Sequence, residues 1–211
     1  MRPLASLLFV FLLAIGARAE VDEPFGFATV PDPQNRFAQH WQGVQRQWAV
    51  ERGILHQCRA DLAFCAPAAQ RFLQIIDDTR ALSGRIRLAH INRAINLTIK
   101  AKDDVTNYGV GEIWTTPLAT LANGAGDCTD YAIAKYYLLG EVGIAENDRR
   151  LLIVSSKNPR DIHAVLAVRA ERRWLILDNK TLAIVDAGDS GYAPLLEFTN
   201  RGRPAVCGSR S

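Results

Sequence analysis

The chain has 211 residues, of which 48% are hydrophobic and 22% charged, with 15 glycines and 9 prolines. These proportions are ordinary for a globular protein and exclude collagen-like, low-complexity and intrinsically disordered chains. The formal net charge is +3, and the basic residues are spread along the chain, which argues against a nucleic-acid-binding protein. A chain of this length is expected to form one domain with a substantial core.

Residues 1–19 have the features of a secretory signal peptide. The basic residue Arg2 precedes an unbroken apolar stretch, and small residues stand at Ala17 and Ala19, in the A-x-A pattern that signal peptidase accepts. The apolar stretch is too short to cross a bilayer, which takes about 20 residues. We expect cleavage after Ala19, an exported protein with no membrane span, and a single mature domain over residues 20–211. An uncleaved amphipathic anchor is the alternative.

Export changes how the four cysteines are interpreted, because disulfides persist outside the cytosol. Cys58 and Cys65 bracket the segment CRADLAFC, where a disulfide would close a short loop between two helices. Two buried free thiols on one helix face are the alternative. Cys207 lies in a polar stretch that we expect to be a frayed tail, which leaves Cys128 without an obvious partner.

Helical periodicity runs through the first half of the chain. The residues Phe37, Trp41, Val44 and Trp48 recur at the spacing of one helical face, after a helix start predicted at Asp32-Pro33. Four more helices are predicted: residues 66–80, residues 84–96, a short helix from Thr116-Pro117 to Gly124, and a helix that starts at Asp127.

The second half of the chain changes to the period of strands. Four short, alternating runs rich in β-branched residues predict an antiparallel meander: LLIVSS, DIHAVLAVRA, RRWLILDNK and TLAIVDAG. Helices first and strands afterwards predict an α+β domain, with N-terminal helices packed on one face of a C-terminal sheet. A Rossmann fold is excluded, because strands and helices do not alternate from the start and Gly109 and Gly111 lack a third glycine.

The segment GDCTDYAIAKYYLL places a cysteine at the start of a helix. Asp127 has the chemistry of an N-cap, and Asp130 three residues later approximates a capping box. Cys128 would occupy the first helical position, where the helix dipole lowers the pKa of a thiol and favours a nucleophilic thiolate. The flanking acids oppose that thiolate, so a protonated histidine would be needed to hold it. A small buried core thiol is the alternative.

Two strands supply candidate partners for this cysteine. His163 opens the run DIHAVLAVRA, and Asp178 closes the run RRWLILDNK. If an even-length loop such as Arg169 to Arg172 joins the two strands, His163 and Asp178 lie directly opposite each other on one face, within reach of a hydrogen bond. Cys128, His163 and Asp178 would then form a nucleophile, a base and an orienting acid.

An oxyanion hole is expected at the same helix start. The backbone N–H of Cys128 would point toward the oxygen of a tetrahedral intermediate. Trp114 or Tyr108, in the upstream segment NYGVGEIWTTP, would supply a second donor or a wall for the substrate. Core packing is the alternative for both aromatic residues.

The sequence resembles a known family at these residues. GDC-x-DYAIAKYYLL, preceded by W-x-TP-x-x-x-L-x-x-G and followed by HAVLAV and LDN, is similar to the bacterial transglutaminase-like cysteine proteases, whose best-known members are the LapG-type periplasmic proteases that release biofilm adhesins. The resemblance covers residues 103–200. It implies a papain-like transglutaminase fold, the triad Cys128, His163 and Asp178, an outer-membrane adhesin as protein substrate, and control by an inner-membrane receptor.

The resemblance implies a calcium site with one departure. Adhesin-releasing members have an acidic residue directly after the catalytic cysteine, where this chain has Thr129. Asp127 and Asp130 remain candidate calcium ligands, although helix capping explains both equally well. Calcium relies on several hard oxygen ligands, so the loss of one carboxylate weakens such a site. No cofactor is expected for the chemistry itself.

These residues together predict a periplasmic cysteine endopeptidase. A transglutaminase-like acyl or amide transferase would use the same triad, with an amine in place of water, and is the first alternative. The second is a non-catalytic binding module of the same fold in which Cys128 is inert.

Overall fold

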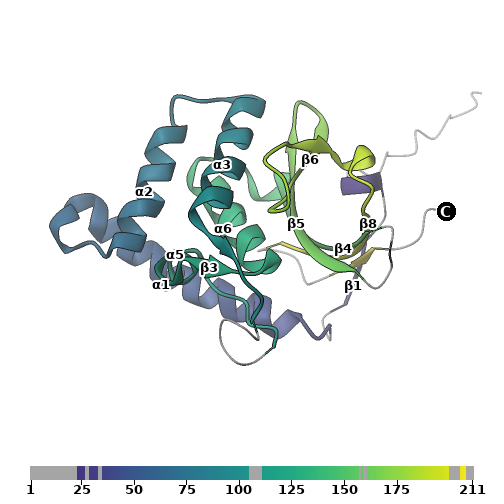
Figure 1. The fold of residues 1–211 in the computed structure, drawn as a ribbon, viewed down its shortest axis with the longest axis horizontal. Helices are drawn as coiled ribbons and strands as arrows, with labels where there is room; N and C mark the ends of the chain where they lie inside the picture. Colours follow the sequence, from purple (N-terminus) through teal and green to yellow (C-terminus); the bar gives the residue numbers. More distant parts are fainter. Residues whose placement is uncertain are drawn as a thin grey trace, which may run out of the picture.

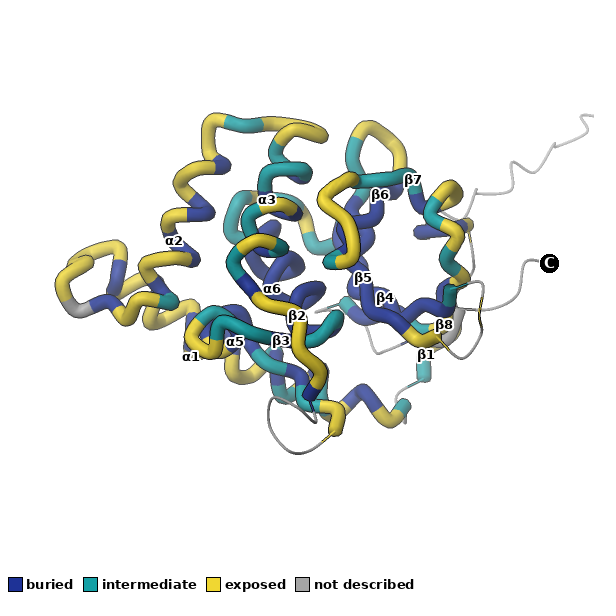
Figure 2. Tube along the Cα trace, viewed as in Figure 1, coloured by how far each residue is buried: buried dark blue, intermediate teal, exposed yellow. Residues whose placement is uncertain are grey.

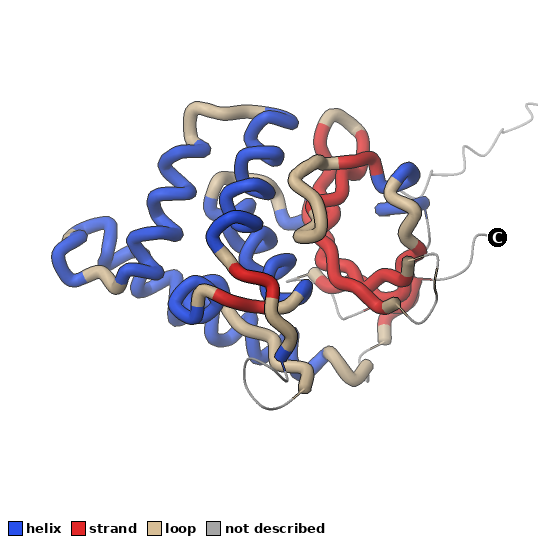
Figure 3. The backbone as a smooth tube through the Cα atoms, viewed as in Figure 1, coloured by secondary structure: helices blue, strands red, loops and turns tan. Residues whose placement is uncertain are grey.

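The structure is a computed structural model of the chain, and it describes residues 23–26, 29–32, 35–104, 111–156, 158, 161–199 and 205–207. The predicted signal peptide and Tyr108 lie outside these residues. Helices occupy one side of the molecule and the main sheet the other, as Figures 1 and 3 show. This is the α+β architecture that the order of the elements predicted. In the described ranges, no helix combines the length and the apolar character that crossing a membrane requires.

The described part of the chain contains all the predicted helices. They are α1 (Ala38–Ala60), α2 (Pro67–Thr79), α3 (Gly84–Thr98), α5 (Pro117–Asn123) and α6 (Cys128–Glu141). The first helix begins later than the predicted start at Asp32-Pro33, because residues 36 and 37 form a turn in which Phe37 N–H donates to Asn35 Oδ1 at 2.9 Å. Cys58 and Cys65 form the predicted disulfide, which joins the last turn of α1 to the residues before α2.

Helix α6 is the centre of the fold. Every residue from 129 to 139 is buried, with the other helices on one side and the sheet on the other (Figure 2). A helix that is buried all round belongs to the core rather than to the surface. The start of this helix is therefore held rigidly against the sheet.

The main sheet has the strand order β1-β9-β8-β4-β5-β6-β7 among the described residues, and all neighbouring strands are antiparallel. Its strands are β1 (Thr29–Pro31), β4 (Arg149–Ser155), β5 (Ile162–Ala170), β6 (Arg173–Leu177), β7 (Val185–Asp186), β8 (Ala193–Phe198) and β9 (Ala205–Cys207). The predicted meander is present as β4-β5-β6-β7.

The last predicted run, residues 181–188, is a strand only over β7, so this part of the prediction was wrong. Its first residues belong to a loop that α3 holds in place: Asn92 Nδ2 donates to Thr181 O at 3.0 Å, and Asn96 Nδ2 donates to Asp178 O at 2.8 Å. The loop therefore leaves the sheet directly after Asp178.

Strands β8 and β9 were not predicted. β8 pairs with β4, on the side away from β5, so the sheet extends beyond a simple meander. Cys207 lies in β9, which pairs with β8 and β1, and the expected frayed tail was wrong there. These pairings join segments far apart in the sequence, which local patterns do not reveal.

The sheet is buried on both faces. Residues such as Ala164 and Leu166 of β5 pack against the helices, whereas Val165 and Ala167 belong to a smaller cluster with Trp174 on the opposite face. β4 is buried along its whole length. The expected alternation was therefore wrong for β4 and most of β5: because helices and the smaller cluster cover both faces, these strands are nearly continuous apolar runs.

Candidate active site

The hairpin between β5 and β6 determines how His163 and Asp178 meet. Ala170 pairs with Arg173, and the two residues between them, Glu171 and Arg172, have φ of 52° and 62°, which is typical of a two-residue type I′ turn. The predicted four-residue loop was wrong, and the register differs by two residues from the predicted one. A shift of two residues keeps every side chain on its face of the sheet, so His163 and Asp178 still share one face.

His163 and Asp178 are in direct contact. His163 Nε2 lies 2.8 Å from Asp178 Oδ1, and the two residues are only 3% and 5% exposed. An ionised carboxylate can only accept hydrogen bonds, so Nε2 carries the proton and donates. The neutral ring therefore has an unprotonated Nδ1, the nitrogen that can accept a proton from another group.

Asp178 is held by donors at both of its oxygens. Oδ1 also accepts Lys180 N–H at 3.0 Å, and Oδ2 accepts the hydroxyl of Tyr192 at 2.6 Å. Burial by itself would raise the pKa of Asp178, but the hydrogen bonds from His163, Lys180 and Tyr192 outweigh it and hold this pKa well below its usual range. Asp178 is therefore ionised at neutral pH.

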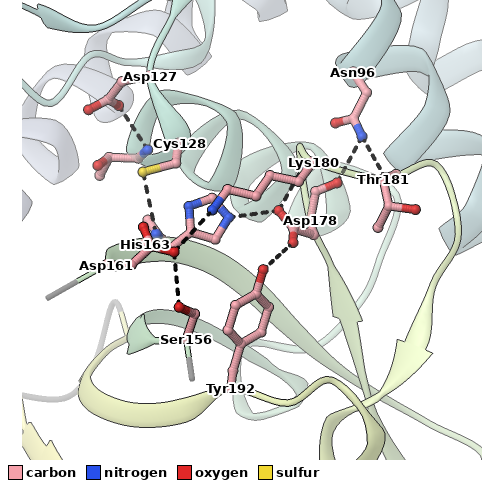
Figure 4. Close-up of polar contacts among 12 residues, drawn as sticks. Asn96, Asp127, Cys128, Ser156, Asp161, His163, Asp178, Lys180, Thr181 and Tyr192 are labelled. Atoms are coloured by element: carbon pink, nitrogen blue, oxygen red, sulfur yellow. Dashed lines mark hydrogen bonds and ion pairs between the residues drawn. The ribbon is translucent and has the colours of Figure 1, made fainter. Parts of the chain in front are cut away.

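Cys128 lies on the side of the His163 ring opposite to Asp178 (Figure 4). Its Sγ lies 3.4 Å from the backbone nitrogen of Ala164, the residue after His163. Figure 4 shows the ring of His163 between the sulfur of Cys128 and the carboxylate of Asp178. The three predicted residues thus come together from the start of α6, the start of β5 and the end of β6.

The thiol of Cys128 is protonated at rest. Burial, together with the charge of Asp127, raises its pKa to about 11, although Ala164 N–H and Thr129 act in the opposite direction. The expectation that the helix start lowers this pKa was wrong, because burial and the adjacent carboxylate dominate. The sulfur therefore needs a base to remove its proton.

The start of α6 is fixed by the predicted capping box. Asp127 Oδ1 accepts the N–H groups of Thr129 at 2.8 Å and Asp130 at 3.1 Å, and Asp130 Oδ2 accepts Asp127 N–H at 3.2 Å. Gly126 allows this close packing, because a Cβ there would lie 2.6 Å from Asp130 Oδ2. The sequence G-D-C-x-D thus presents Cys128 in one orientation.

A third carboxylate, that of Asp104, which no sequence motif predicted, joins Asp127 and Asp130. The short parallel strands β2 (Lys100–Ala101) and β3 (Ala125–Gly126) pair with each other and bring Asp104 beside the start of α6. One carboxylate oxygen from each of the three acids lies within 4.8 Å of the others. No motif links Asp104 to Asp127, so only the pairing of β2 with β3 reveals this cluster.

The chemistry of this acidic cluster suits a divalent cation. Burial raises the pKa of all three carboxyl groups, that of Asp127 to about 7 with a further contribution from the charge of Asp130. Among the described residues, Asp104 Oδ1 is buried with no hydrogen-bond partner. Three hard oxygen donors in one buried place are the ligands that calcium prefers, even with Thr129 in place of an acid.

Of the two aromatic candidates, the structure describes only Trp114, which packs in the core. Trp114 is buried, its indole N–H donates to Glu112 Oε1 at 3.1 Å, and its ring packs against Phe37 and Phe198. This arrangement favours the core-packing alternative. Tyr108 lies outside the described residues.

The sequence also matches a family profile. The profile described as bacterial transglutaminase-like cysteine proteinase, BTLCP, matches residues 47–201, which include Cys128, His163 and Asp178. The chain belongs to this family. It is accordingly a transglutaminase-like cysteine protease. No curated protein shows significant sequence similarity to the chain.

Solved structures support the fold of this BTLCP protein. Legionella pneumophila LapG matches with a TM-score of 0.59 at 23% identity, covering 74% of this chain and 86% of that chain. Its calcium-bound form matches with a TM-score of 0.60 at 22% identity over 74% and 90% of the two chains, and its EGTA-treated form with 0.60 at 24% over 76% and 87%. At these identities the matches establish the shared fold.

Proposed function

We propose that this cysteine protease is an exported endopeptidase that uses Cys128 as nucleophile, His163 as base and Asp178 as orienting acid. The observation that carries the proposal is the bond from His163 Nε2 to Asp178, which leaves Nδ1 unprotonated on the side of Cys128. A protonated thiol beside an unprotonated imidazole nitrogen is the arrangement that proton transfer requires.

The proposed reaction proceeds in two halves. Nδ1 of His163 takes the thiol proton as Sγ of Cys128 attacks the peptide carbonyl carbon, and the backbone N–H of Cys128 stabilises the oxyanion. The imidazolium then protonates the leaving amine, and a thioester remains on Cys128. In the second half, Nδ1 removes a proton from water, the hydroxide attacks the thioester, and the imidazolium returns the proton to the departing sulfur.

Asp178 contributes through charge and orientation. It stabilises the imidazolium that both halves form, and it keeps the ring in the tautomer that presents Nδ1 to the sulfur. Because burial keeps the thiol protonated, the thiolate exists only together with the imidazolium. Because the side chains around these two groups exclude water, the attraction between the thiolate and the imidazolium is stronger than it would be in bulk water.

The cellular context is also part of the proposal. The signal-peptide pattern of residues 1–19 and the disulfide Cys58–Cys65 both favour an oxidising compartment outside the cytosol. The family resemblance then favours a periplasmic enzyme that releases a cell-surface adhesin and that an inner-membrane receptor controls. Hydrolysis is favoured over acyl transfer by membership of a proteinase family.

A secreted-proteome digest tests the proposed function. We expect the purified mature protein to produce new fragments from the secreted and surface proteins of its parent cell, and Cys128→Ala to produce none, because the only proposed nucleophile is gone. Mass spectrometry of the new termini would identify the substrate. A matched control is Thr129→Ser, which keeps the thiol and the helix start.

Two results would contradict this proposal. Fragments that appear equally with Cys128→Ala would show that another group or a contaminant cleaves. Incorporation of an added primary amine at glutamine, without new termini, would favour the transferase alternative.

We further propose that Asp104, Asp127 and Asp130 hold a calcium ion. The support is the 4.8 Å grouping of their carboxylate oxygens and the unpartnered Oδ1 of Asp104 within the described residues. A bound cation would neutralise Asp127, whose charge opposes ionisation of the neighbouring thiol. The calcium-bound form of Legionella LapG is consistent with a role for calcium in this fold.

Calcium removal should lower the stability of the protein. We expect millimolar calcium to raise the Tm of protein treated with EGTA, since a ligand at about 100 times its Kd adds about 2.7 kcal/mol to the free energy of unfolding. Asp104→Asn should remove this response, and the exposed Asp77→Asn should keep it. A Tm that calcium leaves unchanged, or that responds equally in Asp104→Asn, would contradict the site.

A further inference from the structure

Tyr192 lies beside the proposed catalytic pair, and the proposed mechanism gives it no role. It stands just before β8, and its ring centroid lies 5.8 Å from that of His163, with the ring planes 43° apart. Its hydroxyl donates to Asp178 Oδ2 at 2.6 Å (Figure 4). Tyr192 therefore contacts Asp178, the orienting acid, and its ring packs beside that of His163, the base.

The backbone around Tyr192 is built to hold it there. Ser190 Oγ donates to Ala187 O at 2.7 Å and accepts the N–H of Tyr192 at 3.2 Å. Gly191 between them has φ of 73°, a left-handed conformation that glycine adopts without strain. This turn places the hydroxyl of Tyr192 within hydrogen-bond distance of Asp178.

The direction of the hydrogen bond follows from the chemistry of its partners. An ionised carboxylate only accepts, so the phenol must donate. Burial and the charge of Asp178 both raise the pKa of Tyr192, which keeps the phenol protonated. The two oxygens of Asp178 thus have different tasks: Oδ1 accepts from His163 and Lys180, and Oδ2 accepts from Tyr192.

We propose that Tyr192 is a positioning residue that fixes the carboxylate plane of Asp178 and limits the negative charge that His163 experiences. This inference rests on the proposed function of His163 as the base. A charge-assisted hydrogen bond draws electron density toward its donor. Without it, only the bonds at Oδ1 hold the carboxylate, so its plane is less firmly fixed and more charge is concentrated on the oxygen that His163 contacts.

The consequence is a measurable change in the basicity of His163. Loss of the phenol hydroxyl leaves Asp178 a stronger partner for the imidazolium, so His163 should bind its proton more tightly. We expect Tyr192→Phe to favour the imidazolium form of His163 and to lower kcat about tenfold with KM unchanged, because catalysis needs the neutral ring in one orientation.

NMR titration of the His163 ring tests this directly and needs no substrate. The Cys128→Ala protein is used as the background, with ring nitrogen shifts reporting both the pKa and the tautomer. Tyr192→Phe should titrate at higher pH, and Ser190→Ala, which loosens the turn, should shift the titration less in the same direction. Tyr131→Phe is the matched control, because it removes a buried hydroxyl that bonds to Ile99 O instead.

The outcomes separate this inference from the proposed function. An unchanged His163 titration in both Tyr192→Phe and Ser190→Ala overturns the positioning role, even if Cys128-dependent cleavage is observed. A shift as large in Tyr131→Phe also overturns it, because the effect would then be a general loss of stability. Absence of cleavage with a shifted titration would leave Tyr192 acting on Asp178 and would overturn the peptidase proposal alone.

Discussion

Asp178→Asn is expected to lower kcat/KM by about 10³–10⁴-fold, the loss typical of neutralising the acid in a triad. The amide oxygen can still accept from His163 Nε2, but it has no charge with which to stabilise the imidazolium. The free energy of unfolding should change little, because the amide keeps hydrogen-bonding groups for Lys180 N–H and for the hydroxyl of Tyr192. Initial rates on a substrate found in the proteome digest measure the effect.

Asp161→Asn is the matched control for this prediction. Asp161 is exposed, pairs with Lys180 Nζ at 3.9 Å and accepts from Ser156 Oγ at 3.0 Å. Exposed pairs contribute little energy, so its neutralisation should change the rate less than about threefold. A comparable loss in both variants, or a loss below tenfold in Asp178→Asn, would mean that Asp178 is not the orienting acid.

Lys135→Met is expected to stabilise the protein at neutral and lower pH. Lys135 lies in the middle of α6, is 0% exposed, and in the described part of the chain its Nζ has no hydrogen-bond partner. Burial lowers its pKa to about 7, and the charge of Asp178 offsets only part of this. An ammonium group in the core therefore costs free energy that a methionine of similar size would avoid.

The sign of the pH dependence follows from proton binding. Between pH 7 and the ordinary pKa of lysine, the unfolded chain holds a proton on Lys135 and the folded chain does not, so this residue makes stability rise with pH. Below pH 7 the folded state carries the full penalty, which is on the order of 5 kcal/mol for this shift in pKa. We expect Lys135→Met to raise the free energy of unfolding by up to that amount at pH 6. The increase of stability with pH that Lys135 causes should be absent in this variant.

Denaturant unfolding at pH 6, 7.5 and 9 measures this effect. The Cys128→Ala background removes the thiol, whose raised pKa would otherwise make stability fall with pH above 9. Lys102→Met is the control, because Lys102 is exposed. Equal pH dependence in Lys135→Met and the parent would mean that burial of the Lys135 ammonium carries no such cost.

Burial shifts the pKa values of the ionisable groups around Cys128. Within a few residues of Cys128, the chain buries a thiol and two carboxyl groups, and burial raises the pKa of each. Asp178 is the exception, since three donors surround it. Groups whose environments push their pKa values apart are typical of acid–base sites.

Several features of this protein were determined by local sequence. Helical and strand periods located the helices α1, α2, α3, α5 and α6 and the strands β4 to β6, because each period reflects which face of an element is buried. Asp127 and Asp130 predicted the capping box, since cap chemistry depends on residues three apart. The spacing of Cys58 and Cys65 predicted their disulfide, and the two-residue period placed His163 and Asp178 on one face even though the register was wrong by two.

Other features were decided only by tertiary structure. Asp104 joins Asp127 and Asp130 through the pairing of β2 with β3, Tyr192 reaches Asp178 through a turn before β8, and Lys135 is buried because helices and sheet enclose α6. No local pattern pointed to these roles of Asp104, Tyr192 and Lys135. Their neighbours come from distant segments, and which segments meet depends on the packing of the whole core rather than on the conformational preferences of a few residues.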